Sequence, residues 1–109
     1  MRTKMPNNLS NKNGLECAVS PEKLNMAIKN AHRLRISPMI IQKADAVFVC
    51  IDGAALEKLT AECYDIELEI FKLLMSGCNQ TEIARQIGMS QSNVSRKITK
   101  MKKILFQSE

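Results

Sequence analysis

Apolar residues recur at helical spacing through the C-terminal half of the chain. A first stripe consists of Ile66, Ile70, Leu73 and Leu74. Gly77 follows this stripe, and a glycine in a left-handed conformation commonly ends a helix. A second stripe consists of Val94, Ile98, Met101 and Leu105. The spacings of four, three and four residues in this second stripe keep its members on one face of a helix. The two stripes therefore predict two helices with a connecting segment between them.

The connecting segment has the signals of a third, shorter helix. Asn79 is a favourable N-cap, and Glu82 stands where a capping box needs an acidic partner. The residues expected to face inward are Ile83, Ala84 and Ile87. Gly88 supplies the turn, and Ser90 caps the next helix. A short helix, a tight turn and a longer helix form a helix-turn-helix unit. The alternative is an ordinary helical hairpin inside a bundle.

The first part of the chain is less regular. Residues 1–19 are rich in Asn, Ser and Lys and show no period, so we expect a flexible basic arm. Ser20-Pro21-Glu22 predicts the start of a helix that runs to about Arg33. Ser37-Pro38 repeats this start signal.

The segment after Pro38 is ambiguous. Ile40, Ala44, Val47 and Ile51 would share one face of a helix, whereas AVFVCI at residues 46–51 reads equally well as a buried strand. We favour the helix. Asp52-Gly53 predicts a turn, and a further helix is expected from Ala54 to about Cys63.

These elements predict an all-α fold, a small helical domain with a C-terminal tri-helical helix-turn-helix. Residues 1–19 would be the arm, residues 20–63 an N-terminal helical segment and residues 64–109 the helix-turn-helix domain.

Charge divides the chain in a way that the helix pattern alone does not show. The 109 residues carry a net charge of +5, yet residues 37–75 hold seven acidic and three basic side chains. Residues 76–109 hold six basic and two acidic side chains. A basic C-terminal third suggests a surface for a polyanion, and an ordinary solvated face is the alternative.

Cysteine and histidine give no sign of a metal site or a catalytic group. The four cysteines are widely spaced, and His32 is the single histidine. We therefore expect no metal, no cofactor and no enzymatic activity. The N-terminus lacks the apolar core of a signal peptide, and the longest apolar run is too short to span a bilayer. We expect a cytoplasmic protein with reduced thiols that does not enter a membrane.

Residues 65–105 carry a family likeness. The stretch from Gly77 to Ala84, Gly-x-x-x-x-Glu-Ile-Ala, is followed by Ser-x-x-x-Val from Ser90 to Val94. With the preceding helix, this resembles the tri-helical DNA-binding unit of bacterial transcription regulators, as in LuxR-type C-terminal domains and the fourth region of sigma factors. In its small size the chain is also similar to PapB-like fimbrial operon regulators and TrfB/KorA-like plasmid repressors. The resemblance implies a sequence-specific regulator of a bacterial operon.

The resemblance implies that the last helix reads the major groove of double-stranded DNA. Gln and Arg can pair with base edges, while Ser and Thr allow a close approach. Lysines further along would meet phosphates, and the free N–H groups at the start of the short helix would meet another phosphate. The residues expected to touch DNA are Gln80, Thr81, Ser90, Gln91, Ser92, Ser95, Arg96, Lys97, Thr99, Lys100 and Lys103. Neither Arg96 nor Lys100 belongs to the core stripe, so their replacement is expected to leave the melting temperature unchanged.

A regulator of this kind commonly binds DNA as a dimer, because one recognition helix reads few base pairs. The apolar segment from Met39 to Ile51 is the candidate pairing surface of a homodimer or higher homo-oligomer, and plain core is the alternative. RNA polymerase is a further expected partner. A rival function is that of a protein-interaction adaptor, such as an antitoxin or a polymerase-binding accessory factor, which would use the acidic middle segment.

Overall fold

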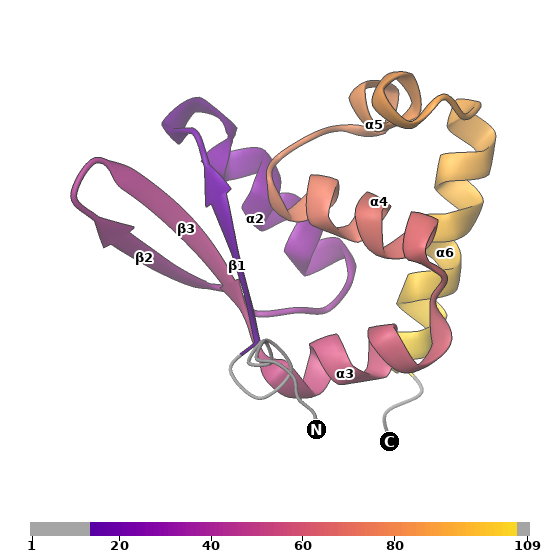
Figure 1. The fold of residues 1–109 in the computed structure, drawn as a ribbon, viewed down its shortest axis with the longest axis horizontal. Coiled ribbons are helices and arrows are strands. Elements are labelled where there is room, and N and C mark those ends of the chain that lie inside the picture. Colours follow the sequence, from indigo (N-terminus) through magenta and orange to yellow (C-terminus); the bar gives the residue numbers. More distant parts are fainter. Residues whose placement is uncertain (1–13, 107–109) are drawn as a thin grey trace, which may run out of the picture.

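The structure, a computed structural model, describes residues 14–106. A small sheet lies on one side of the molecule and a cluster of helices on the other (Figure 1). The elements, in chain order, are β1 (Leu15–Val19), a single 3-10 turn η2 (Pro21–Lys23), α2 (Leu24–Arg33), β2 (Met39–Lys43), β3 (Ala46–Ile51), α3 (Gly53–Glu62), α4 (Asp65–Met75), α5 (Gln80–Ile87) and α6 (Gln91–Phe106).

The predicted all-α fold is wrong, because three strands form an antiparallel sheet in the order β1-β3-β2. The segment for which we favoured a helix is the hairpin of β2 and β3, so residues 20–63 are not a purely helical segment. Ser37-Pro38 precedes a strand and does not start a helix.

The hairpin forms because its second strand suits a half-buried sheet. Val47 and Val49 are β-branched and lie on the face that also carries Ile51, which is buried with Val49 against the helices. A two-residue turn, Ala44-Asp45, joins the strands, and Ala44 takes a positive φ of 52° there. Turns of this length usually place glycine or asparagine at such a position, so the sequence lacked the usual hairpin signal.

Part of the predicted flexible arm is instead a strand. Leu15–Val19 form β1, which pairs along its whole length with β3, from Leu15 opposite Ile51 to Val19 opposite Val47. Cys17 and Val19 of this strand are buried in the core. Residues 1–13, with the remainder of the predicted arm, lie outside the described residues.

The predicted helices are confirmed in α2, α3, α4, α5 and α6. The helix predicted from Ser20 to Arg33 is present as η2 followed by α2. Asp52 is the N-cap of α3, where its carboxylate accepts a hydrogen bond from the Ala54 N–H. The left-handed conformation predicted for Gly77 is confirmed by its φ of 92°.

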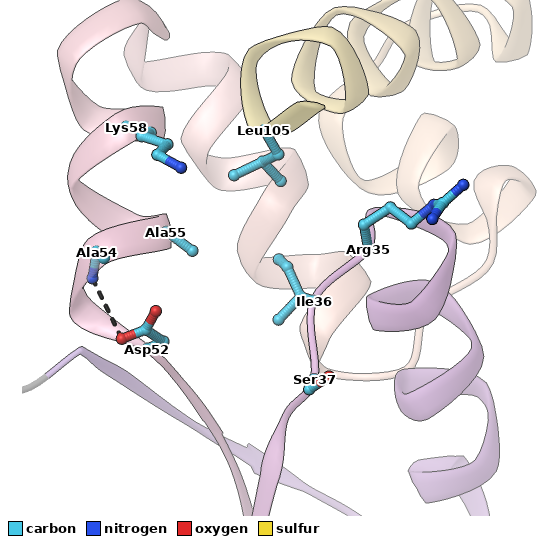
Figure 2. A pocket seen from close by; sticks show the side chains of 8 residues that line it. All are labelled: Arg35, Ile36, Ser37, Asp52, Ala54, Ala55, Lys58 and Leu105. Atoms are coloured by element: carbon cyan, nitrogen blue, oxygen red, sulfur yellow. Dashed lines mark hydrogen bonds between the residues drawn. The ribbon is translucent and has the colours of Figure 1, made fainter. Parts of the chain in front are cut away.

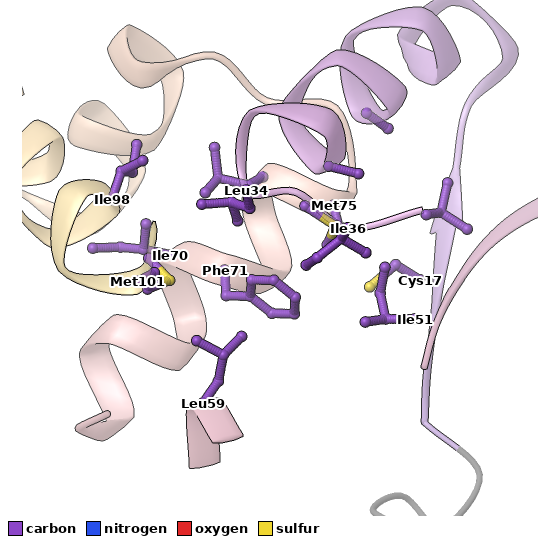
Figure 3. Packing of buried hydrophobic residues seen from close by; sticks show 14 of the residues in the cluster. Cys17, Leu34, Ile36, Ile51, Leu59, Ile70, Phe71, Met75, Ile98 and Met101 are labelled. Carbon is purple, nitrogen blue, oxygen red and sulfur yellow. The ribbon is translucent and has the colours of Figure 1, made fainter. Parts of the chain in front are cut away.

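One continuous core joins the sheet to the helices (Figure 3). Cys17 and Ile51 of the sheet, Leu34 after α2, Phe71 of α4 and Met101 of α6 all belong to it. The stripe predicted for α6 is fully buried. In α4, however, Ile66 is 38% exposed, and its neighbour Glu67 is buried in its place.

Two polar side chains, Asn30 of α2 and Lys23 of η2, attach the N-terminal part of the chain to the helix-turn-helix. The buried Asn30 side chain donates hydrogen bonds to the carbonyl oxygens of Leu74 and Cys78, at 2.8 and 3.0 Å. Lys23 pairs with Glu82 at 2.9 Å, which stabilises the start of α5 from outside. The N-terminal part of the chain therefore fixes both the end of α4 and the beginning of α5.

Candidate functional site

The turn between α5 and α6 has the predicted geometry. Asn79 accepts from the Glu82 N–H at 2.8 Å, and the Glu82 carboxylate accepts from the Asn79 N–H at 2.9 Å, so the predicted capping box is confirmed. Gly88 ends α5 in a left-handed conformation, with a φ of 82°. Ser90 Oγ accepts from the Asn93 N–H at 3.2 Å and caps α6 as expected.

Thr81 and Gln91, expected at the candidate DNA surface, lie together. The Gln91 amide donates to the Thr81 hydroxyl at 3.2 Å, and both side chains are exposed. This contact joins the first turns of the two helices, so Gln91 is oriented before any ligand binds. Gln80 is half-buried beside Thr81 at the start of α5.

The outward face of α6 is polar and basic. It lies opposite the buried stripe of Val94, Ile98, Met101 and Leu105. The helix contains no Asp or Glu. The residues that are exposed on this face, all of them expected from the sequence, are Ser92, Ser95, Arg96, Thr99 and Lys103.

Arg96 is held by a residue that sequence reasoning missed. Its guanidinium donates to Asn93 Oδ1 at 3.0 Å, and both side chains are exposed. The spacing of three residues on one helix was the available signal, since side chains at i and i+3 are neighbours. The contact limits the orientations that Arg96 samples.

Lys97 and Lys100 lie on the flank of α6 that faces α4, where both meet the buried Glu67. The Nζ–Oε distances are 3.1 Å for Lys97 and 2.8 Å for Lys100. The Glu67 side chain is 1% exposed, and its carboxylate also accepts from the Tyr64 N–H at 2.9 Å. The ammonium of Lys100 lies 4.7 Å from the centroid of the Tyr64 ring. Both lysines therefore connect α6 to the core.

The surroundings of Glu67 determine its charge. Burial alone would raise the pKa of Glu67, but the hydrogen bonds from Lys100, the Tyr64 backbone and Lys97 outweigh it and hold the pKa at about 2. The carboxylate is thus ionised at neutral pH, and its two ion pairs fix the rotation of α6 relative to α4.

A shallow hollow of about 440 Å³ runs beside the outward face of α6. It brings together Arg96, Thr99, Lys100 and Lys103, with Glu62 of α3 and Ile104 also lining it. Four of the predicted contact residues therefore share one surface, bordered by the end of α3.

A second hollow, of about 260 Å³, lies between α3 and the segment after α2 (Figure 2). Lys58 points into it, and the guanidinium of Arg35 turns away toward the ring of Phe106, at 5.0 Å from the ring centroid. Asp52, at the other end, is already occupied as the cap of α3. This arrangement leaves the hollow without a set of convergent free polar groups.

Residues 14–106 contain no group of three or more His, Cys, Asp or Glu side chains that could hold a metal ion. Burial raises the pKa of the Cys17 thiol to about 11, which keeps it protonated. No helix between residues 14 and 106 is long and apolar enough to cross a membrane.

Comparisons with protein-family models, with curated proteins and with solved structures find no match for this chain. What α6 can bind is therefore inferred from its own side chains and their surroundings.

Proposed function

We propose that this protein is a sequence-specific DNA-binding transcriptional regulator that places α6 in the major groove. The observation that carries the proposal is the outward face of α6, where Ser92, Ser95, Arg96, Thr99 and Lys103 are exposed together without an acidic residue on the helix. Short hydroxyl side chains let a helix approach base edges, and Arg pairs bidentately with guanine.

The first two turns of α6 would read bases, and its later turns would meet the backbone. Gln91 and Ser92 lie at the N-terminal end, next to Thr81 of α5. Arg96 and Ser95 lie one turn further on, and Lys103 lies beyond them, where the straight helix leaves the curved groove. Ser90, Gln80 and Thr81 lie beside the free N–H groups of the two helix starts, which attract a phosphate.

The ion pairs of Glu67 refine the roles expected of two lysines. Lys97 and Lys100 can meet a phosphate only by sharing their charge with Glu67, because each Nζ is already within 3.1 Å of that carboxylate. Lys103 is exposed and is the better candidate for a phosphate contact. We therefore assign positioning of α6 to Lys97 and Lys100, and phosphate contact chiefly to Lys103.

The experiment is selection of bound sequences from a random DNA pool, followed by titration of the selected site and a scrambled site. Arg96→Ala should lose about 1–3 kcal/mol of discrimination and relax preference at one base pair. Arg33→Ala removes an exposed arginine on α2, outside the helix-turn-helix, and is the matched control. It should keep wild-type discrimination.

Two results would contradict the proposal. Arg96→Ala with unchanged discrimination would remove Arg96 from base recognition. Failure of the wild-type chain to enrich any sequence, together with salt-insensitive binding to a protein, would favour an adaptor over a DNA-binding regulator.

A further inference from the structure

Strand β2 exposes apolar side chains on both faces of the sheet. Met39 is 63% exposed and Ile40 is 41% exposed, although neighbouring residues of a strand point to opposite faces. A ligand seated on one face would explain only one of them. A strand added beside β2 would extend the sheet and cover both, which makes the edge of β2 the surface of interest. At the other edge of the sheet, β1 exposes no large apolar side chain.

The register of the hairpin shows which backbone groups of β2 point to the open edge. Lys43 and Ala46 flank the two-residue turn and form a hydrogen-bonded pair. Pairs in an antiparallel ladder alternate between hydrogen-bonded and non-hydrogen-bonded, so Ile41 and Met39 also bond to β3. The N–H and C=O groups of Ile40 and Gln42 consequently point away from β3.

Only one antiparallel self-pairing uses all of these groups. With Ile41 opposite Ile41 of a second copy, Ile40 bonds to Gln42 of that copy and Gln42 to Ile40, giving four backbone hydrogen bonds. A shift in one direction brings Gln42 opposite Pro38, which has no N–H to donate. A shift in the other brings Ile40 opposite Ala44, which belongs to the turn.

Charge is compatible with the same register. Lys43 is the single charged residue of β2, and it would lie opposite Met39 of the second copy. No two like charges face each other, and the aliphatic part of Lys43 would cover the most exposed apolar side chain of the strand. Lys43 keeps its pair with Glu16 on its own sheet, at 3.5 Å.

We propose that two copies of this chain pair through β2, in antiparallel register about Ile41, to form one six-stranded sheet. The choice of a second copy as the occupant rests on the proposed function, because a helix-turn-helix regulator binds a two-fold operator as a dimer. The pairing buries Met39 and Ile40 and gives hydrogen-bond partners to the N–H and C=O groups at the open edge of β2. An unpaired edge of this kind is otherwise a site of uncontrolled association.

Disulfide trapping tests this register in the full-length chain. Opposed residues of a non-hydrogen-bonded pair have Cα atoms about 4.5 Å apart, within the range of a disulfide. Ile41→Cys should therefore form a covalent dimer under mild oxidation. Met39→Cys is the matched control, because residue 39 of each copy would be displaced by four residues, roughly 13 Å. Both variants need a Cys50→Ser background, since Cys50 lies directly opposite Met39 in its own chain.

The wild-type chain should sediment as a dimer without DNA. Gln42→Pro removes an N–H that points to the open edge, so it should yield a folded monomer. Met39→Cys forming covalent dimers as readily as Ile41→Cys would overturn the register, and a monomeric wild-type chain would overturn the pairing. If Gln42→Pro does not fold, the two cysteine variants still test the register of the pairing.

The pairing and the proposed function can fail separately. A monomeric wild-type chain that binds the selected DNA would support the proposed function and contradict the pairing. A dimer that binds no DNA would support the pairing and contradict the function.

Discussion

At the scale of single residues, Glu67 makes a contribution to folding stability that the sequence pattern did not show. It occupies a core position next to the predicted core residue Ile66, and it binds two lysines of α6. Because its folded pKa is about 2 and its ordinary value is 4.5, its stabilising contribution is fully present above about pH 4.5. This contribution is lost as the pH falls from 4.5 toward 2.

We expect Glu67→Gln to lower the free energy of unfolding at pH 7 by about 1–3 kcal/mol. The amide keeps the volume but loses both ion pairs, while the two lysines regain water because their side chains are already about a third exposed. The acid-induced loss of stability between pH 4.5 and 2 should shrink as well. Urea unfolding at a series of pH values measures both effects.

Glu69→Gln is the matched control, since Glu69 is exposed on the same helix. It should change the stability by less than about 0.5 kcal/mol and leave the acid dependence as in the wild type. Equal effects in the two variants would exclude a special role for Glu67.

At the scale of elements, the lysines of α6 have two different surroundings: Lys97 and Lys100 pair with the buried Glu67, whereas Lys103 is exposed to solvent. From the sequence we expected Lys100→Ala to leave the melting temperature unchanged, but the contact between Lys100 and Glu67 changes that prediction. Lys100→Ala should now lower the melting temperature, because it removes a charge-assisted hydrogen bond to a buried carboxylate. Thermal melting followed by circular dichroism checks this.

Lys103→Ala should behave in the opposite way. Lys103 is exposed on the outward face, so its loss should leave the melting temperature unchanged and lower the salt slope of DNA binding by about one unit. A destabilised Lys103→Ala, or a Lys100→Ala as stable as the wild type, would contradict this division.

The two turns of the helix-turn-helix depend on glycine for different reasons. Gly88 has a φ of 82° with open space around it, so Gly88→Ala meets only the backbone strain of about 1–2 kcal/mol. Gly77 has a φ of 92°, and a Cβ there would also overlap the carbonyl oxygen of Lys23. We expect Gly77→Ala to be the more destabilising of the two in chemical unfolding. The reverse order would show that the close approach of Lys23 to this turn adds no strain.

At the scale of the whole molecule, the helix-turn-helix shares its core with the N-terminal part. Phe71 and Met75 of α4 pack in one cluster with Leu34 and Ile36 (Figure 3). Asn30 also satisfies two carbonyl oxygens, those of Leu74 and Cys78. A fragment without these partners exposes apolar surface and leaves both carbonyls without Asn30.

We therefore expect the fragment 64–109 to show no cooperative thermal transition, whereas the full chain melts in a single one. Circular dichroism melting of both, at equal concentration, measures this. A cooperative transition in the fragment would mean that the helix-turn-helix is an independent domain.

The sequence by itself determined the helix-turn-helix. Its signals are local: the capping pair Asn79 and Glu82, the left-handed Gly88 and the four-three-four spacing of the α6 stripe all act within a few residues of each other. Local hydrogen bonds and steric limits therefore suffice to predict where α5 and α6 begin and where α5 ends. The buried stripe of α6 also predicted which residues are exposed, because they lie on the opposite face of the helix.

The sheet and the charge pattern of the site were decided only by tertiary structure. AVFVCI at residues 46–51 fits a helix or a strand, and one of its two pairing partners, β1, lies about thirty residues earlier in the chain. Likewise, the two lysines that neutralise the buried Glu67, Lys97 and Lys100, lie 30 and 33 residues away from it, so the local sequence does not show that Glu67 is buried. Such long-range contacts decide which polar groups can be buried, because only a partner brought near by the fold can offset the loss of water.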